Sequence, residues 1–379
     1  MISRRHLIAA GGLLLPSTHL LGDAARSDGS DAPARARRVR ADIIGWDGIA
    51  DHRTGSAGDA ATAQWLAARI ARAGVSAEMD CFRFRRRVPR AAHVSDASRR
   101  AEGVPLFDGG ATGAEGISGR AGPLGGADPI AVCRFGPINA DPRTQRLQAA
   151  RRTAQHAGIV AIADAAYVRP GLTLLNADAY GDAFGPPVLQ VAARDGAWLE
   201  AAAAAGRTLQ MTVSLSTGDV DACNVGARIA GRNPGLAPVV VMTPRSAWWT
   251  STSERAGGIA AWLEILRHLA SAAPERSVIF TANTGHELGH VGLQHFLEDN
   301  ERLAGAAHAW IHLGANIAAK DAPILFQASD QQLMARGRAA LAEAGLPSPL
   351  ITPPGERPYG EVRDIYDAGG RYVSVLGEN

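Results

Sequence analysis

Short apolar runs alternate with amphipathic stretches along most of this chain. The run at residues 278–281 is rich in β-branched side chains and is stopped by turn residues at 283–285, so it predicts a buried strand. Runs at 239–242 and 309–313 predict two more strands. Between the strands at 239–242 and 278–281, residues 258–269 place their large apolar side chains on one face of a helix. This alternation predicts a doubly wound α/β fold, with a mostly parallel sheet and helices on both faces.

The pattern changes character between residues 95 and 216. Glycines become frequent, and short strands at 129–135 and 159–163 flank a helix rich in Arg, Ala and Gln. After residue 216 the first pattern returns. We therefore expect a main α/β domain formed by residues 40–94 and 217–379, with residues 95–216 inserted as a smaller β/α domain.

Residues 1–24 have the pattern of an export signal. Arg4 and Arg5 form a twin-arginine pair, and the apolar stretch that follows at 7–15 is too short to span a bilayer. The sequence therefore predicts a twin-arginine signal, export to the periplasm or the extracellular space, and no stable membrane insertion afterwards. An ordinary basic start with two adjacent arginines is the alternative.

Charge and cysteine content narrow the range of partners. The formal net charge is +2, and the basic runs at 35–38 and 85–87 lack the interleaved aromatic residues of a nucleic-acid groove. We therefore expect no nucleic-acid partner. The three cysteines, Cys81, Cys133 and Cys223, lack the spacing of a metal knuckle. At most one disulfide can form; its pairing stays open, and buried thiols are the default expectation.

Two ionisable residues follow the predicted strand at 278–281 directly. His286 and Glu287 stand just past its carboxyl end, where open α/β sheets keep their chemistry. The five residues from His286 to His290 also match the HExxH motif of zincins, whose two histidines lie one turn apart on a helix. Gly285 and Gly289 oppose a helix there, because glycine disfavours a helix interior by about 1 kcal/mol.

The same segment resembles peptidase family M28, the secreted zinc aminopeptidases and glutamate carboxypeptidases. That family has a strand followed by Gly-Glu-Glu-x-Gly-Leu-x-Gly-Ser. The corresponding residues here are Gly285-His286-Glu287-Leu288-Gly289-His290-Val291-Gly292-Leu293. Residues 254–264 resemble the start of the family's Asp-Asn-Ala-Ser-Gly helix, and the insertion resembles its protease-associated domain. The resemblance covers roughly residues 40–379 and implies a zinc-dependent hydrolase of peptide or aminoacyl substrates.

Several metal ligands that the resemblance implies are missing. The family's His-x-Asp falls on Thr243-Pro244-Arg245, and neither Thr nor Arg is a usual zinc ligand. A further ligand Asp falls on Gly314, and the last ligand His is expected just beyond Asn379. His312, two residues before Gly314 on the predicted strand, faces the same side about 6.6 Å away. It could therefore approach the site, or it could be a hydrogen-bonded core histidine.

Three other positions of the family's site fall on residues that can ionise. The family's bridging Asp falls on Glu254, its adjacent ligand Glu is kept as Glu287, and its base falls on His286. We therefore expect Glu254 and Glu287 as metal ligands and His286 with Glu287 in the catalytic step. Because zinc takes about four ligands, these residues predict one zinc ion at most. We also expect Arg245 to pair with the two glutamates, which favours a metal-free site.

A second group of residues is expected to contact substrate. Trp248 and Trp249 are predicted on a loop near the site, with a structural role at the edge of the core as the alternative. Tyr359 and Glu361 fall where the family has a substrate-side Ser-Asp-His element. With Arg245, these residues form the predicted substrate-binding set.

Three functions remain open, and we favour a hydrolase. The first is an exported peptide or amide hydrolase that uses Glu287, His286 and Glu254 with one zinc ion or none. The second is a non-catalytic relative that binds peptide-like ligands through Arg245, Glu254 and the two tryptophans. The third is a zincin. The substrate's identity and the oligomeric state are not determined by the sequence.

Overall fold

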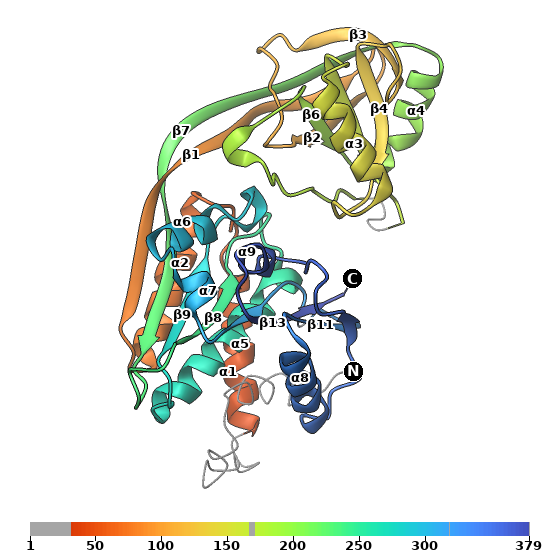
Figure 1. The fold of residues 1–379 in the computed structure, drawn as a ribbon. Helices are drawn as coiled ribbons and strands as arrows, with labels where there is room; N and C mark the ends of the chain where they lie inside the picture. The colour runs from red at the N-terminus through yellow and green to blue at the C-terminus, as the bar shows by residue number, and fades with distance from the viewer. Residues whose placement is uncertain (1–31, 167–170, 318, 379) are drawn as a thin grey trace. The chain divides into compact units, whose positions relative to one another are not determined.

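The computed structural model describes residues 32–166, 171–317 and 319–378, shown as a ribbon in Figure 1. The chain divides into two compact units. The first consists of the chain up to Arg83, of Asp221–His286, and of the chain from His290 onward; the second consists of Phe84–Val220 and Glu287–Gly289. The predicted signal segment lies outside the described residues. Within the described part of the chain, no helix is long and apolar enough to cross a membrane.

The first unit is built on one mixed sheet. In order across it, the strands are β7 (Thr208–Ile229), β9 (Val278–Asn283), β8 (Val239–Pro244), β10 (Ala309–Leu313), β13 (Tyr372–Gly377), β11 (Ile324–Ala328) and β12 (Leu350–Thr352). Strands β9, β8, β10 and β13 are parallel, whereas β7 and β11 run antiparallel to their neighbours β9 and β13. The chain passes from β8 to β9 on one side and then to β10 on the other. The strand order therefore switches direction at β8, and open α/β sheets bind ligands beside such a point.

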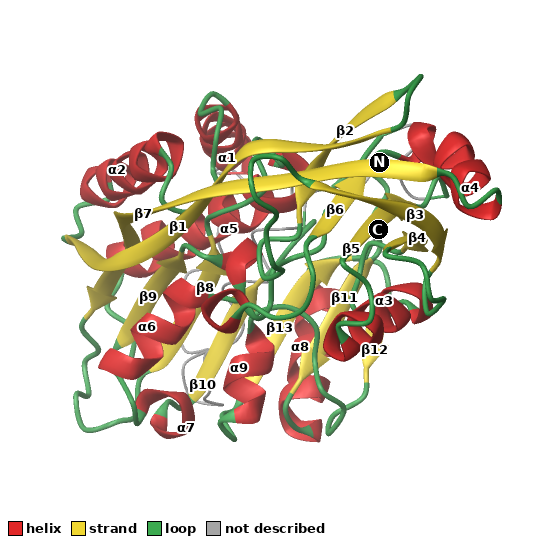
Figure 2. Cartoon of the chain, turned by 90° about the horizontal axis from the view of Figure 1, so that it is seen from above, coloured by secondary structure: helices red, strands yellow, loops and turns green. Residues whose placement is uncertain are grey.

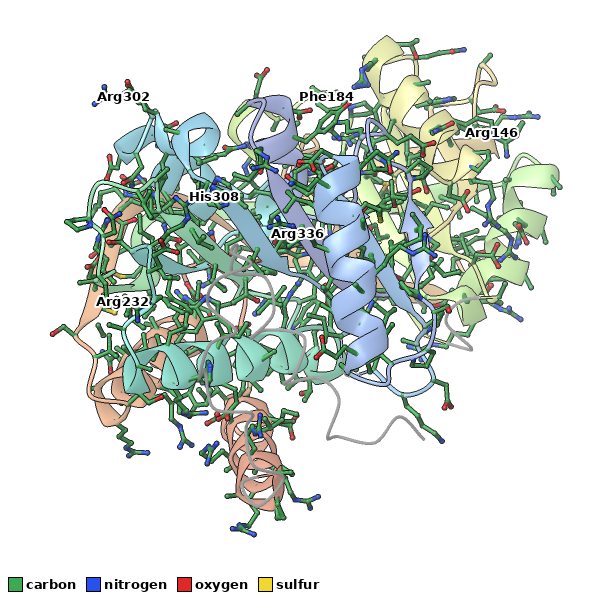
Figure 3. All side chains as sticks on the ribbon, turned by 60° about the horizontal axis from the view of Figure 1, so that its bottom comes forward. Arg146, Phe184, Arg232, Arg302, His308 and Arg336 are labelled. Carbon is green, nitrogen blue, oxygen red and sulfur yellow. A yellow bond between two sulfur atoms is a disulfide. The ribbon has the colours of Figure 1, made fainter. Side chains whose placement is uncertain are left out.

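Helices cover both faces of this sheet, as the sequence predicted. One face carries α1 (Ala32–Asp47), α2 (Ala57–Arg72), α5 (Thr252–Ser271) and α8 (Gln331–Glu343); the other carries α6 (Val291–Asp299) and α9 (Val362–Asp367), with α7 (Leu303–Ala306) nearby. Successive residues of β8 point to opposite faces: Val239 and Val241 pack under α5, while Val240 and Met242 pack in the second core. Figure 2 shows these helices and strands as a cartoon. Helix α8, which bears the labelled Arg336, covers β11 (Figure 3). The doubly wound α/β prediction is confirmed.

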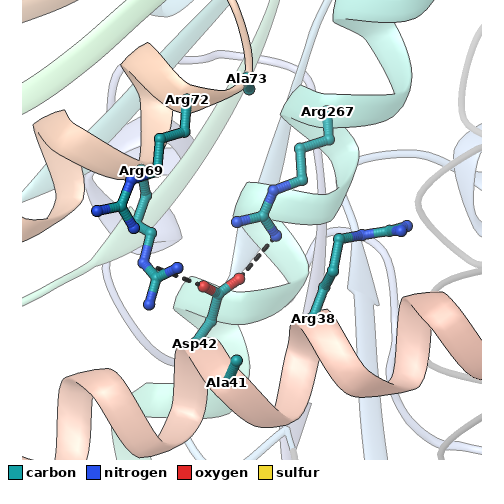
Figure 4. A pocket seen from close by; sticks show the side chains of 7 residues that line it. All are labelled: Arg38, Ala41, Asp42, Arg69, Arg72, Ala73 and Arg267. Atoms are coloured by element: carbon teal, nitrogen blue, oxygen red, sulfur yellow. Dashed lines mark hydrogen bonds and ion pairs between the residues drawn. The ribbon is translucent and has the colours of Figure 1, made fainter.

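A buried carboxylate ties α1 to α2 and α5. Asp42 is 1% exposed; one of its oxygens accepts a hydrogen bond from Arg267 at 2.7 Å, and the other lies 3.4 Å from Nε of Arg69. Figure 4 shows these pairs in a pocket of about 310 Å³. The pocket is lined by Arg38, Ala41, Asp42, Arg69, Arg72, Ala73 and Arg267. Because its buried acid is already paired, we interpret this basic pocket as an ion-pair network that positions α1.

The second unit has its own run of paired strands and two cores. Its strands are, in order, β1 (Ala77–Ser95), β2 (Arg100–Pro105), β6 (Val188–Val191), β5 (Gly158–Ala163), β4 (Ile130–Phe135), β3 (Ile117–Pro123) and the first part of β7. Helices α3 (Pro142–Thr153) and α4 (Gly196–Ala204) cover opposite faces, since Val160 packs with Trp198 of α4 and Ile159 packs with Leu147 of α3. The predicted insertion, residues 95–216, falls within this unit. Its likeness to a protease-associated domain stays a prediction.

Strand β7 and the cysteines differ from expectation. Strand β7 continues without a break through residue 216, where the sequence predicted the end of the inserted domain. Cys81 on β1 and Cys223 on β7 form a disulfide, so the expectation of buried thiols is wrong for these two. Cys133 is a free thiol, and burial raises its pKa to about 12.

Candidate active site

The carboxyl ends of β8, β9 and β10 bring the candidate residues of the first unit together. His286 follows β9 directly and begins a single 3-10 turn, His286–Leu288, with its backbone N–H donating to Oγ of Ser246 at 3.0 Å. Glu254 lies in the first turn of α5. Its Oε1 atom is 3.6 Å from Nε2 of His286. Two of the residues that the sequence singled out therefore face each other at the switch point of the sheet.

A buried hydrogen-bond chain lies behind His286. Glu361, just before α9, is 3% exposed; one of its oxygens accepts from Nδ1 of His286, and the other lies 3.2 Å from Nε2 of His312. Nδ1 of His312 is in turn 2.8 Å from the hydroxyl of Ser374. Sequence reasoning placed Glu361 on the substrate side; the structure buries it as a partner of two histidines.

Burial and neighbouring groups determine the protonation of Glu361 and His312 in this hydrogen-bond chain. Burial alone would raise the pKa of Glu361, but the charge and hydrogen bond of His286 and the hydrogen bond of His312 hold that pKa well below its ordinary value. Burial lowers the pKa of His312, and Glu361 opposes this shift only in part. Glu361 is therefore ionised at neutral pH and accepts from both rings, while neutral His312 donates from Nε2 and accepts the Ser374 hydroxyl proton.

His290 falls on a position of the family's motif that is not a metal ligand, yet it lies beside His286. The two rings are 5.8 Å apart with an interplanar angle of 18°, and Nδ1 of His290 is 2.7 Å from Oδ2 of Asp364. No zincin helix forms between the two histidines, because Gly289 and His290 both have positive φ, +74° and +62°, and α6 begins only at Val291. The zincin interpretation is therefore wrong in its geometry.

The prediction for Arg245 is also wrong. Its guanidinium is fully buried and lies 2.9 Å from Oδ1 of Asp59 on α2, and it also donates to the carbonyls of Asp59 and Cys223. Helix α2 is capped by Ser56, whose side chain accepts from the backbone N–H of Asp59. Because Arg245 is held by these partners, it does not pair with Glu254 and is not placed to bind substrate.

The remaining predicted residues have the following places. Glu287 is fully buried and belongs to the second unit, where its carbonyl accepts from Ala177; its role as a ligand stays a prediction. Trp248 lies 6.0 Å from Trp249, ring to ring, and Trp249 is 38% exposed. Tyr359 is 52% exposed. These three aromatic side chains stay candidates for contact with substrate.

The positions that hold zinc in family M28 do not fit two ions in this chain. The Thr243 hydroxyl donates to the carbonyl of Leu313 at 2.8 Å, and Arg245 is engaged by Asp59. A side chain at Gly314 would place its Cβ 2.7 Å from Cε1 of His312, so the His312 ring fills the space of the lost ligand. Among the described residues, two other groups could hold a metal ion: His286 with His290 and Glu361, and Asp80 with His295 and Asp299.

Comparisons with known proteins agree with this fold. The model of peptidase family M28 matches residues 253–345. A zinc aminopeptidase from Bacillus subtilis is 16% identical, with a TM-score of 0.71, over 90% of this chain and 84% of that one. An M28 peptidase precursor from Shewanella amazonensis is 15% identical, with a TM-score of 0.69, over 92% and 88% of the two chains.

Two further results complete the comparison. An aminopeptidase from an Aneurinibacillus strain is 14% identical, with a TM-score of 0.67, over 98% of this chain and 87% of that one. A search of curated proteins found no match to the sequence. The resemblance to peptidase family M28 is therefore confirmed, in sequence over residues 253–345 and in fold over most of the chain.

Proposed function

We propose that this protein is an exported hydrolase of peptide or amide bonds that acts with at most one zinc ion. The observation that carries the proposal is the convergence of Glu254 and His286, 3.6 Å apart, at the switch point of an M28-type sheet. The similar structures that were named as aminopeptidases suggest substrates with a free amino group. The disulfide between Cys81 and Cys223 supports export, because such bonds persist mainly in oxidising compartments.

Glu254 is the most exposed of the three ionisable residues Glu254, His286 and Glu361. Its side chain is 30% exposed, compared with 11% for His286 and 4% for Glu361. As an ionised carboxylate it can take the proton of an attacking water and return it to the leaving amine, the usual work of a general base. A zinc ion bound in such a site polarises the substrate carbonyl and lowers the pKa of its water. His286 lies between Glu254 and the more deeply buried Glu361, to which it donates a hydrogen bond.

Activity of the full chain on unblocked dipeptides and aminoacyl anilides tests this proposal. We expect Glu254→Gln to lower kcat by about 100-fold or more while the protein stays folded, because it removes the base and keeps its shape. Asp299→Asn, which changes an exposed carboxylate elsewhere on the first unit, is the matched control and should keep full activity. Full activity in Glu254→Gln would overturn the assignment of the base.

A non-catalytic relative is the second candidate, and one observation favours it. Arg245 and Asp59 form a buried ion pair at a position where the family holds metal. A ligand-binding protein would show no turnover on the whole substrate panel but a rise in melting temperature with peptides. Turnover that Glu254→Gln abolishes excludes this candidate.

A further inference from the structure

We propose that His286, His290 and Glu361 form a single zinc site that replaces the ligand positions of family M28. Each of these residues offers one ligand atom, and the three atoms lie within 4.8 Å of one another. His290 and Glu361 are buried, and His286 is nearly so. Two imidazoles and one carboxylate with an open fourth position form a ligand set of catalytic zinc sites. This inference deepens the proposed function, on which it rests for its chemistry.

His290 is already oriented as a ligand by its neighbour. The Asp364 carboxylate accepts from Nδ1–H of His290 at 2.7 Å, which leaves the lone pair on Nε2. Metal-binding histidines in proteins almost always have such a partner, which fixes the tautomer and makes the ring more basic. The left-handed backbone of His290, at φ +62°, brings this ring beside that of His286.

Glu361 also has a hydrogen-bond partner that orients it, as Asp364 orients His290. His312 lies 3.2 Å from one of its oxygens, and Ser374 supports His312 in turn. The other oxygen contacts Nδ1 of His286. A metal ion bound between these two atoms would leave the proton of the neutral His286 ring on Nε2, which faces Glu254, and would leave the His312 contact in place. The ligands and their supporting shell are therefore both formed by residues of the first unit.

The local charge also favours a dication. Three carboxylates of the first unit, from Glu254, Glu361 and Asp364, lie around the two rings. One cationic side chain, Arg255, lies among them and donates to Oε1 of Glu254 at 2.6 Å. With neutral histidines these four side chains carry two net negative charges, three minus one. A divalent ion would balance this charge in a largely buried setting, where unbalanced charge is costly.

The surface cluster of Asp80, His295 and Asp299 provides an internal control. Nε2 of His295 is 3.1 Å from Asp80 and 3.7 Å from Asp299, but the three side chains are 24% to 62% exposed. Both carboxylates in this cluster face the same nitrogen, Nε2 of His295. A protein that binds zinc through this cluster would respond to His295→Ala, whereas one that binds through the buried set would not.

Equilibrium dialysis of the chelator-treated full-length protein with zinc chloride tests the site directly. We expect one zinc per chain, with an affinity lowered at least about 100-fold in His290→Ala and in Glu361→Gln. Asp364→Asn, which keeps every ligand, should lower the affinity about 10- to 100-fold. His295→Ala should change nothing. Circular dichroism melting shows which variants are folded, and Asp364→Asn covers the case in which removal of a buried ligand unfolds the protein.

The outcomes separate this inference from the proposed function. Failure to bind zinc, binding of two ions, or loss of zinc with His295→Ala alone would each overturn the site. One zinc per chain that depends on His290 and Asp364, in a protein without peptidase activity, would support the site and count against the hydrolase. Peptide hydrolysis by metal-free protein would support the hydrolase and count against the zinc site.

Discussion

Acidification should destabilise the first unit through one buried histidine. His52 is fully buried, its ring is stacked 3.4 Å from that of Trp46, and Nδ1 is 2.9 Å from Oγ1 of Thr62. The Thr62 hydroxyl donates to the carbonyl of Gly58, so it accepts from His52, and the proton of the neutral ring sits on Nδ1. Nε2 is buried without a hydrogen-bond partner. A second proton there would be buried next to the guanidinium of Arg245.

The pKa of His52 gives the size of the effect. Burial, with the charge of Arg245, lowers this pKa from 6.5 to about 4. Between these two pH values the unfolded chain binds a proton that the folded chain refuses, so stability falls as the pH falls. The contribution is fully present above pH 6.5 and lost by about pH 4. At 1.36 kcal/mol per pH unit this amounts to about 3 kcal/mol.

Urea unfolding followed by tryptophan fluorescence at a series of pH values from 8 to 4 measures this loss. His52→Phe keeps the ring stacking and cannot titrate, so the difference in unfolding free energy between it and wild type should change by about 3 kcal/mol across the series. His268→Phe, at an exposed position on α5, should run parallel to wild type. If the wild-type and His52→Phe curves were parallel as well, the reasoning about the buried ring would be refuted.

Three further predictions concern stability. Asp59→Asn removes the charge partner of buried Arg245 and should cost about 3–5 kcal/mol in urea unfolding. Gly314→Ala forces a Cβ against the His312 ring at 2.7 Å and should cost about 1–3 kcal/mol by the same assay, whereas Gly218→Ala, which meets nothing within 4 Å, should cost less. Reduction of the disulfide at Cys81 should lower the unfolding free energy by about 2–5 kcal/mol, compared with and without reductant.

A specific result would contradict each of these three predictions. Wild-type stability in Asp59→Asn would mean that the Arg245 guanidinium reaches water. Equal melting of the Gly314→Ala and Gly218→Ala variants would show that His312 does not fill the space at position 314. An unfolding curve that is unchanged by reductant would argue against the disulfide between Cys81 and Cys223.

The sequence predicted the fold of the first unit well for a physical reason. The runs of β8, β9 and β10 are buried on both faces, so each stands out as a short, mostly apolar stretch. Helix α8 carries a similarly clear signal, because its apolar stripe and the glycine after it mark its length. The full length of strand β7 was not predicted, because its exposed middle, near Gly218, breaks the apolar pattern.

The candidate site was harder to predict, because its contacts join distant parts of the chain. The pairing of Arg245 with Asp59 spans 186 residues and leaves no mark on the local pattern. Glu361 was noticed through the family register, but its two histidine partners could not be read from spacing. The HExxH spacing pointed to His290. Its ring does lie near that of His286, but no helix joins the two residues.

The central claim is that an aminopeptidase fold persists here while its metal ligands have moved to new residues. Anomalous diffraction at the zinc edge, from crystals soaked in zinc chloride, tests this most directly. We predict one peak in the first unit, bounded by His286, His290 and Glu361. Two peaks bridged by Glu254, or no peak at the carboxyl ends of β8 and β9, would contradict the account.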